Sequence, residues 1–127
     1  METAISRAAE GAVRRITLGA LANLVAAPSR GGTPVDTGWA RSNWLLSIGR
    51  PVAAPVGSRD SVSAGEQQQS AAIIATRYRL DQGPVYLTNP VAYIGQLNRG
   101  HSPQARPGFI EAAILRAVDD AARRSRR

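Results

Sequence analysis

Side chains that could carry acid–base or nucleophilic chemistry are few in this chain of 127 residues. It contains one histidine, His101, and no cysteine or lysine. His101 is therefore the single candidate base for a serine nucleophile, and thiolate nucleophiles and cysteine-based zinc sites are excluded. The histidine lies between Gly100 and Ser102 in a polar loop, which favours a solvated or locally hydrogen-bonded side chain over a catalytic or metal-binding one.

The carboxylates are also poorly arranged for chemistry. A glycosidase or a metal site needs acidic residues that come together in pairs or clusters, and no such spacing is present. We therefore predict a protein that is not an enzyme, with no catalytic, cofactor-binding or metal-binding residues. The acidic residues considered are Asp36, Asp60, Glu66, Asp81, Glu111, Asp119 and Asp120.

Composition and charge limit the class of protein. A chain of this length with 43% hydrophobic residues is expected to form one domain with a modest core. All sixteen basic residues are arginine and the formal net charge is +7. This arginine bias is more typical of a GC-rich genome than of a functional demand, although the charge permits anionic partners. Charged residues near the N-terminus exclude a signal-peptide core, and the apolar stretch 16–27 is shorter than the about 20 residues that span a bilayer, so we expect a soluble protein.

Hydrophobic periodicity predicts an α+β fold. We expect a long N-terminal helix over 3–26, a strand over 40–48, a middle helix over 63–78 and a strand over 85–88. A short helix over 90–98 and a final helix that starts at Phe109 complete the pattern. The helices are expected to pack on a small antiparallel or mixed sheet within a single domain, 1–127. The Pro-rich and small-residue segment at about 50–63 is predicted to be a flexible loop or arm.

The N-terminal helix has more apolar surface than one core stripe requires. Leu18, Leu21 and Val25 form a second apolar side near its C-terminal end, which is used either for contact with another subunit or for the chain's own core. Two tryptophans pose a similar alternative: Trp39 and Trp44 flank an arginine and either stack on nucleic acid or serve the core and a contact surface. The candidates for a subunit interface are Leu18, Leu21, Val25, Trp39, Arg41, Arg50 and Arg59.

The final helix is predicted to direct one stripe toward the core. That stripe comprises Phe109, Ile110, Ala113, Ile114, Ala117 and Ala121. Asp119 and Asp120 each precede an arginine by four residues, the favourable order for an ion pair along a helix.

The segment 85–114 organises the chain, because it joins a strand, a Pro-initiated turn of helix, a glycine loop and the start of the last helix. A tight turn around 36–38 precedes the first strand, since Asp can cap backbone N–H groups and Gly adopts positive φ. The residues that define these two motifs are Asp36, Thr37, Gly38 and Trp44 in the first, and Tyr93, Leu97, Gly100, Gln104, Pro107, Gly108 and Phe109 in the second.

These two motifs resemble those of small neck and tail-completion proteins, including tail terminator-like proteins, of long-tailed bacteriophages. They cover about a third of the chain in the expected order. The resemblance implies a structural virion protein that forms a homo-oligomeric ring, hexameric or dodecameric, at the head–tail junction. Such a ring joins connector to tail, contacts other neck, connector or tail proteins, and lets genomic DNA pass through its lumen without sequence-specific binding. The resemblance further implies synthesis in the host bacterial cytoplasm, with neither a membrane nor a small-molecule substrate as partner.

A second hypothesis comes from a different class. The basic charge and the cluster of Trp39, Arg41 and Trp44 are also compatible with a basic nucleic-acid-binding domain. The chain lacks a recognisable recognition helix, aromatic RNA-binding motif or zinc site. The arginines are accordingly expected to act by general electrostatics, so any DNA binding should be weak and should fall steeply as salt rises.

Overall fold

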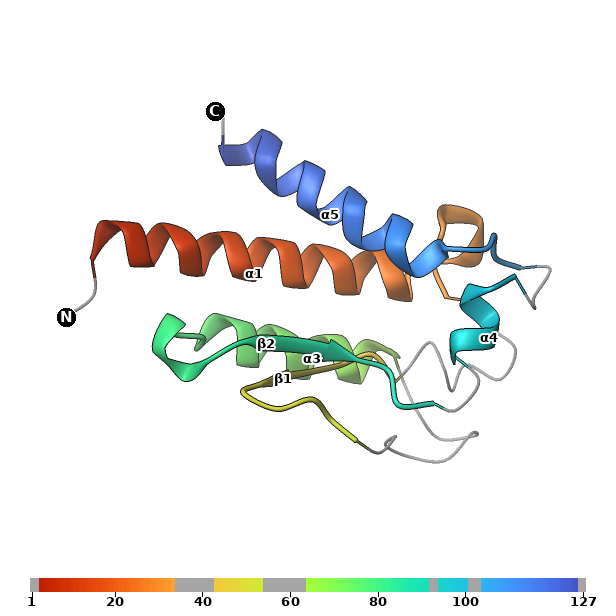
Figure 1. Cartoon of the computed structure of the whole chain (residues 1–127), viewed down its shortest axis with the longest axis horizontal. Helices are drawn as coiled ribbons and strands as arrows, with labels where there is room; N and C mark the ends of the chain where they lie inside the picture. Colours follow the sequence, from red (N-terminus) through yellow and green to blue (C-terminus); the bar gives the residue numbers. More distant parts are fainter. Residues whose placement is uncertain (1–2, 34–42, 54–63, 92–93, 101–103, 126–127) are drawn as a thin grey trace.

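The computed structural model describes residues 3–33, 43–53, 64–91, 94–100 and 104–125 (Figure 1). The chain has an α+β fold, which confirms the predicted class. The helices are α1 (Ala4–Val25), α3 (Ala64–Thr76), α4 (Ile94–Asn98) and α5 (Phe109–Ser125), with 3-10 turns η1 (Pro28–Arg30) and η2 (Leu80–Gln82), and the strands are β1 (Leu45–Ile48) and β2 (Val85–Thr88).

Helix α1 is the central element of the fold. It contacts α5 on one side, and α3 and β2 on the other (Figure 1). Its start is fixed locally, because the Thr3 hydroxyl oxygen accepts a hydrogen bond of 3.0 Å from the Ser6 amide and so caps the first turn. The fold class agrees with the prediction. The C-terminal helix, however, packs on α1, whereas it was expected to pack on the sheet.

The two strands form an antiparallel pair although α3 separates them in sequence. Leu46 lies opposite Leu87 and Ile48 lies opposite Val85, so these two pairs share one face of the sheet. α3 contacts β1 while α1 contacts β2, which places the core between the two helices and this face. β2 has the predicted bounds. β1 begins at Leu45 and is shorter than the predicted strand 40–48, and Asn43, which lies within that range, is fully buried before β1 begins.

The contact between α1 and α5 is close because small residues meet there. A Cβ atom added at Gly19 would lie 3.4 Å from the Cβ of Ala117. Ala113, Ala117 and Ala121 are all buried on the same side of α5. Ile114 was predicted to belong to this core stripe, and that prediction is wrong. Its side chain is 41% exposed, because the alanine row alone permits the close approach to Gly19 and rotates Ile114 outward.

The end of α1 is tied to the start of β1 by a buried hydroxyl group. Thr33 donates twice to the carbonyl of Leu24, from its amide at 2.8 Å and from its hydroxyl at 2.7 Å. The same hydroxyl oxygen accepts a bond of 2.9 Å from the indole N–H of Trp44. The chain reaches this position because Gly32 passes very close to Ala26, where an added Cβ would lie 1.8 Å from the carbonyl oxygen.

The second apolar side of α1 belongs to the core of the single chain. Leu21 and Val25 are 2% and 5% exposed, and both lie in one buried cluster with Trp44 and Phe109. Leu18 packs against that cluster. The two alternatives for this side of α1 were contact with another subunit and burial in the chain's own core, and the structure shows burial in the core. The proposal of Leu21 and Val25 as subunit contacts is thus corrected, because α5 and the strands already cover them.

We predict that Thr33→Val will destabilise the fold. The substitution conserves shape but leaves the buried indole N–H of Trp44 without its acceptor, which typically costs about 1–3 kcal/mol. Thr76→Val is the matched control, because that exposed hydroxyl bonds only to the carbonyl of Ala72 in its own helix. Denaturant unfolding should show a clear loss for the first variant and a change within about 0.5 kcal/mol for the second. Equal stability of the two variants would contradict the role assigned to Thr33.

Candidate functional site

Asn98, the last residue of α4, organises the loop that leads into α5. Its carbonyl accepts from the Gly108 amide at 2.6 Å, and its side-chain oxygen accepts from the Ile110 amide at 3.0 Å. Its side-chain N–H₂ group donates to both carboxylate oxygens of Glu111 at 3.0 Å. One side chain therefore fixes both the backbone and the first acidic residue at the start of α5. The predicted short helix over 90–98 ends at Asn98, but the sequence pattern assigned this side chain no role.

Glu111 has a pKa below its ordinary value of 4.5. The largest cause is the hydrogen bond from the Asn98 side chain, which favours the ionised carboxylate, followed by the bond from its own backbone amide. A carboxylate in the first turn of a helix also interacts favourably with the helix dipole.

The structure brings most of the second motif together. Gly100 has a φ of +96°, and an added Cβ would lie 2.7 Å from Pro107, so the turn after α4 requires glycine. Leu97 packs against the core, Phe109 is buried in it, and Gly108 also has positive φ. Gln104 is exposed. In the first motif, Trp44 is buried in the core. The remaining motif residues, Tyr93, Asp36, Thr37 and Gly38, lie outside the described residues.

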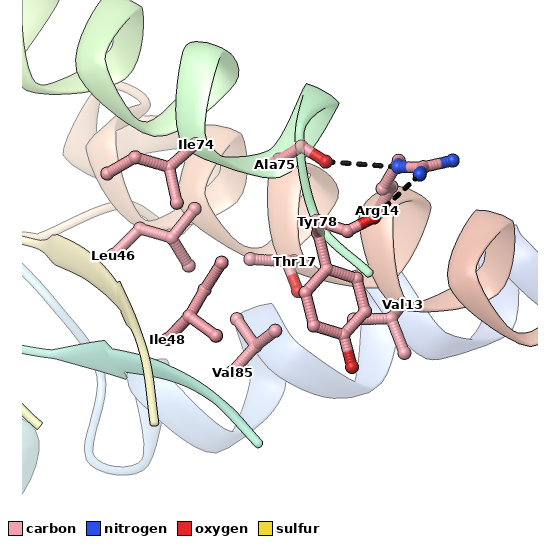
Figure 2. Close-up of a pocket in the computed structure, with 9 residues that line it drawn as sticks. All are labelled: Val13, Arg14, Thr17, Leu46, Ile48, Ile74, Ala75, Tyr78 and Val85. Atoms are coloured by element: carbon pink, nitrogen blue, oxygen red, sulfur yellow. Dashed lines mark hydrogen bonds between the residues drawn. The ribbon is translucent and has the colours of Figure 1, made fainter. Parts of the chain in front are cut away.

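A small cavity beside α1 has the chemistry of a packing defect. Figure 2 shows it between α1, α3 and the two strands, with apolar side chains such as Leu46 and Val85 directed into it. Its volume of about 10 Å³ is close to the minimum that admits a single water molecule. At its edge, the Arg14 guanidinium donates to the carbonyls of Ala75 and Tyr78 at 3.0 and 2.9 Å, which satisfies the C-terminal end of α3. Arg14 is therefore structural.

The described part of the chain contains no group of three His, Asp or Glu side chains placed to hold a metal ion. Two of its acidic residues instead make bonds that support the fold. Glu10 is buried and accepts from the Leu80 amide at 2.7 Å, and Asp120 pairs with Arg124 at 3.1 Å on the exposed side of α5. The second of these is one of the two predicted ion pairs along α5.

Besides Ile5 and Leu80, the described surface exposes large apolar side chains on α5 and on α3. On α5, Ile114, Leu115 and Val118 are 41%, 63% and 41% exposed, and we call these three residues the α5 strip. On α3, Ile73 is 57% exposed beside an open hollow of about 300 Å³. Of the predicted interface residues, Arg50 is exposed, whereas Trp39, Arg41 and Arg59 lie outside the described residues.

Comparisons with models of protein families, with curated proteins and with solved structures gave no match. Among the described residues, no helix has the length and apolar character needed to cross a membrane. The candidate site therefore rests on the surface of this chain alone, and its strongest feature is the α5 strip.

We predict that Phe109→Ala will lower the stability of the protein by about 3–5 kcal/mol, the usual cost of truncating a buried phenylalanine. Phe109 is 4% exposed and joins α5 to the cluster that contains Leu24 and Trp44. Leu115→Ala on the same helix is the control, because its side chain is mostly exposed. Thermal and denaturant unfolding should separate the two variants, and an unchanged melting temperature for Phe109→Ala would refute this packing.

We predict that Asn98→Ala will raise the pKa of Glu111 toward its ordinary value. The stability that the ionised Glu111 contributes is present above the ordinary pKa and is lost as the pH falls through the lowered, folded-state pKa. Titration of the Glu111 side-chain carboxyl carbon by NMR in both proteins measures the change. An identical titration in wild type and variant would show that Asn98 is not the main cause.

Proposed function

We propose that this chain is a structural virion protein that forms a homo-oligomeric ring at the head–tail junction of a long-tailed phage or phage-like particle. Two sequence motifs that resemble neck and tail-completion proteins support the assignment to that place. The observation that carries the assembly is the α5 strip, where three large aliphatic side chains are exposed on a helix whose buried side consists of alanines and one phenylalanine.

The α5 strip is energetically unfavourable on a free surface. Burial of a large aliphatic side chain is worth about 1.5–3 kcal/mol, so exposing three of them together leaves a driving force for association. Both signs of charge flank the strip, with Glu111 and Asp119 as well as Arg123 on the same helix. A second copy of the chain supplies apolar surface and both charge signs, which makes it a suitable occupant.

A ring requires two different surfaces on each subunit. In a head-to-tail interface, one patch of each copy contacts another patch of the next, and the contacts close when the rotation allows. α5 lies on one side of α1 and α3 on the other, so the α5 strip and the hollow beside Ile73 are separate surfaces (Figure 1). We assign the α5 strip of one copy to the α3 surface of its neighbour.

The position in the particle is tested on purified particles that carry this chain. Mass spectrometry should detect the chain in every full particle, and an electron cryomicroscopy reconstruction should show it as a closed ring between the head and the tail. Absence from joined particles, or a single asymmetric copy, would contradict the proposal.

The interface is tested with Leu115→Glu and Ile73→Glu, each of which adds a charge to one of the two surfaces. Each variant alone should fail to assemble in cross-linking and native mass spectrometry, and heads and tails should stay unjoined when it replaces the wild type. An equimolar mixture should form dimers and nothing larger, because one intact α5 strip meets one intact α3 surface.

Ile5→Glu is the matched control, since Ile5 is 84% exposed in the first turn of α1, outside both surfaces. This variant should assemble as the wild type does. Normal assembly of Ile73→Glu, together with loss for Leu115→Glu, would indicate a symmetric contact through α5 and would exclude the head-to-tail arrangement.

A further inference from the structure

A basic groove lies at the end of the molecule where α1 ends and α5 begins. Its volume is about 650 Å³, and three segments form its wall: the η1 turn with Gly31, the segment 104–108 and the first turns of α5. Each segment contributes one arginine, namely Arg30, Arg106 and Arg116. Residues that are 86 positions apart in the sequence thus meet around one open space.

Arg116 spans from α5 to the η1 turn. Its guanidinium lies over Gly31, where an added Cβ would be 3.0 Å from one terminal nitrogen and 3.3 Å from the other. Gly31 has a φ of +87°, so the turn brings its bare α-carbon under the guanidinium in a conformation that other residues rarely adopt. The groove therefore has an arginine that is positioned by packing and not only by charge.

The positive charge of the groove is not neutralised within the described part of the chain. No aspartate or glutamate lines it, and none of its three arginines has a carboxylate within ion-pair distance there. Glu111 follows in the first turn of α5, but its carboxylate is bound to Asn98. Three guanidinium groups around an open space create a positive potential that attracts an anion with several charges.

We propose that this groove binds the phosphodiester backbone of a nucleic-acid strand. The planar guanidinium group matches phosphate oxygens with two parallel hydrogen bonds, and three such groups match a strand that presents successive phosphates. The space is larger than a single small anion needs. Among the described residues of the wall, Phe109 is the aromatic one, and its ring is buried, so these residues offer no ring for stacking on a base. The contact is therefore confined to the phosphodiester backbone of the nucleic acid and does not depend on its base sequence.

This inference does not depend on the proposed ring. A single chain contains the whole groove, and neither the α5 strip nor Ile73 contributes to its wall. A wild-type chain that assembles but does not bind nucleic acid would therefore refute the groove alone, and one that binds nucleic acid but does not assemble would refute the ring alone.

The test is binding of a fluorescent duplex of mixed sequence to the full chain, measured by anisotropy over a series of salt concentrations. Each of Arg30→Gln, Arg106→Gln and Arg116→Gln should weaken binding at low salt. Each should also reduce the slope of log affinity against log salt by about 0.9, the value for loss of one phosphate contact. All three side chains are exposed, so the variants should keep the wild-type melting temperature. A second duplex of unrelated sequence should bind equally well.

Arg77→Gln is the control of equal charge. Arg77 directly follows α3, in the region where Arg14 and Glu10 of α1 bind the chain. Both of these α1 residues lie more than ten positions before the end of α1, where the groove is found. It should leave the slope unchanged. Wild-type affinity and slope in all three groove variants would overturn the proposal. Inorganic phosphate that displaces the duplex at equal phosphate concentration would assign the groove to free phosphate instead. Poly-glutamate that binds more tightly than the duplex would assign it to an acidic protein surface.

Discussion

The close approach of α1 and α5 is the contact on which the rest of the structure depends. Gly19 on α1 and the alanine row of α5 allow the two backbones to meet with no large side chain between them. The side chain of Asn23 crosses the same contact and donates to the Ala113 carbonyl at 2.9 Å. Because the pairing uses small residues, the rotation of α5 about its axis is set by steric fit and not by the number of apolar atoms that it buries.

That rotation has a direct consequence for the surface. With the alanines inside, the larger aliphatic side chains of α5 point away from α1, which is the reverse of the arrangement that maximises burial in a free subunit. A helix with apolar residues on both sides is suited to lie between its own domain and a neighbour. The exposed α5 strip and the close contact between α1 and α5 therefore both follow from the small residues on the inner side of α5.

The opposite side of α1 is held by polar groups that complete other helices. Arg14 binds the last carbonyls of α3, and Glu10 binds the amide of Leu80 in η2. At the other end, Thr33 closes α1 and receives the indole N–H of Trp44. The bonds of Arg14 and Glu10 join residues that are 61 to 70 positions apart in the sequence. Like the bond from Thr33 to Leu24, they satisfy backbone groups that helix ends leave open. They align the two-stranded sheet and α3 under α1, and so fix where the hollow beside Ile73 lies relative to α5.

The amino-acid sequence by itself determined the elements whose signals are local. Periodicity predicts β2 with its observed bounds and α1 to within one residue at each end, and α5 starts at the predicted Phe109, directly after Pro107-Gly108. The turn at Gly100 follows from its need for positive φ. Only the tertiary structure decided which side of each helix is buried. Periodicity places Ile114 and Ala113 on one stripe, and the choice between them depends on the partner, here Gly19. In the same way, the tertiary structure and not the periodicity placed Leu21 and Val25 in the core, because other elements cover them. The meeting of Arg30, Arg106 and Arg116 in one groove also arises from packing, since residues far apart in the chain become neighbours only when α5 lies on α1.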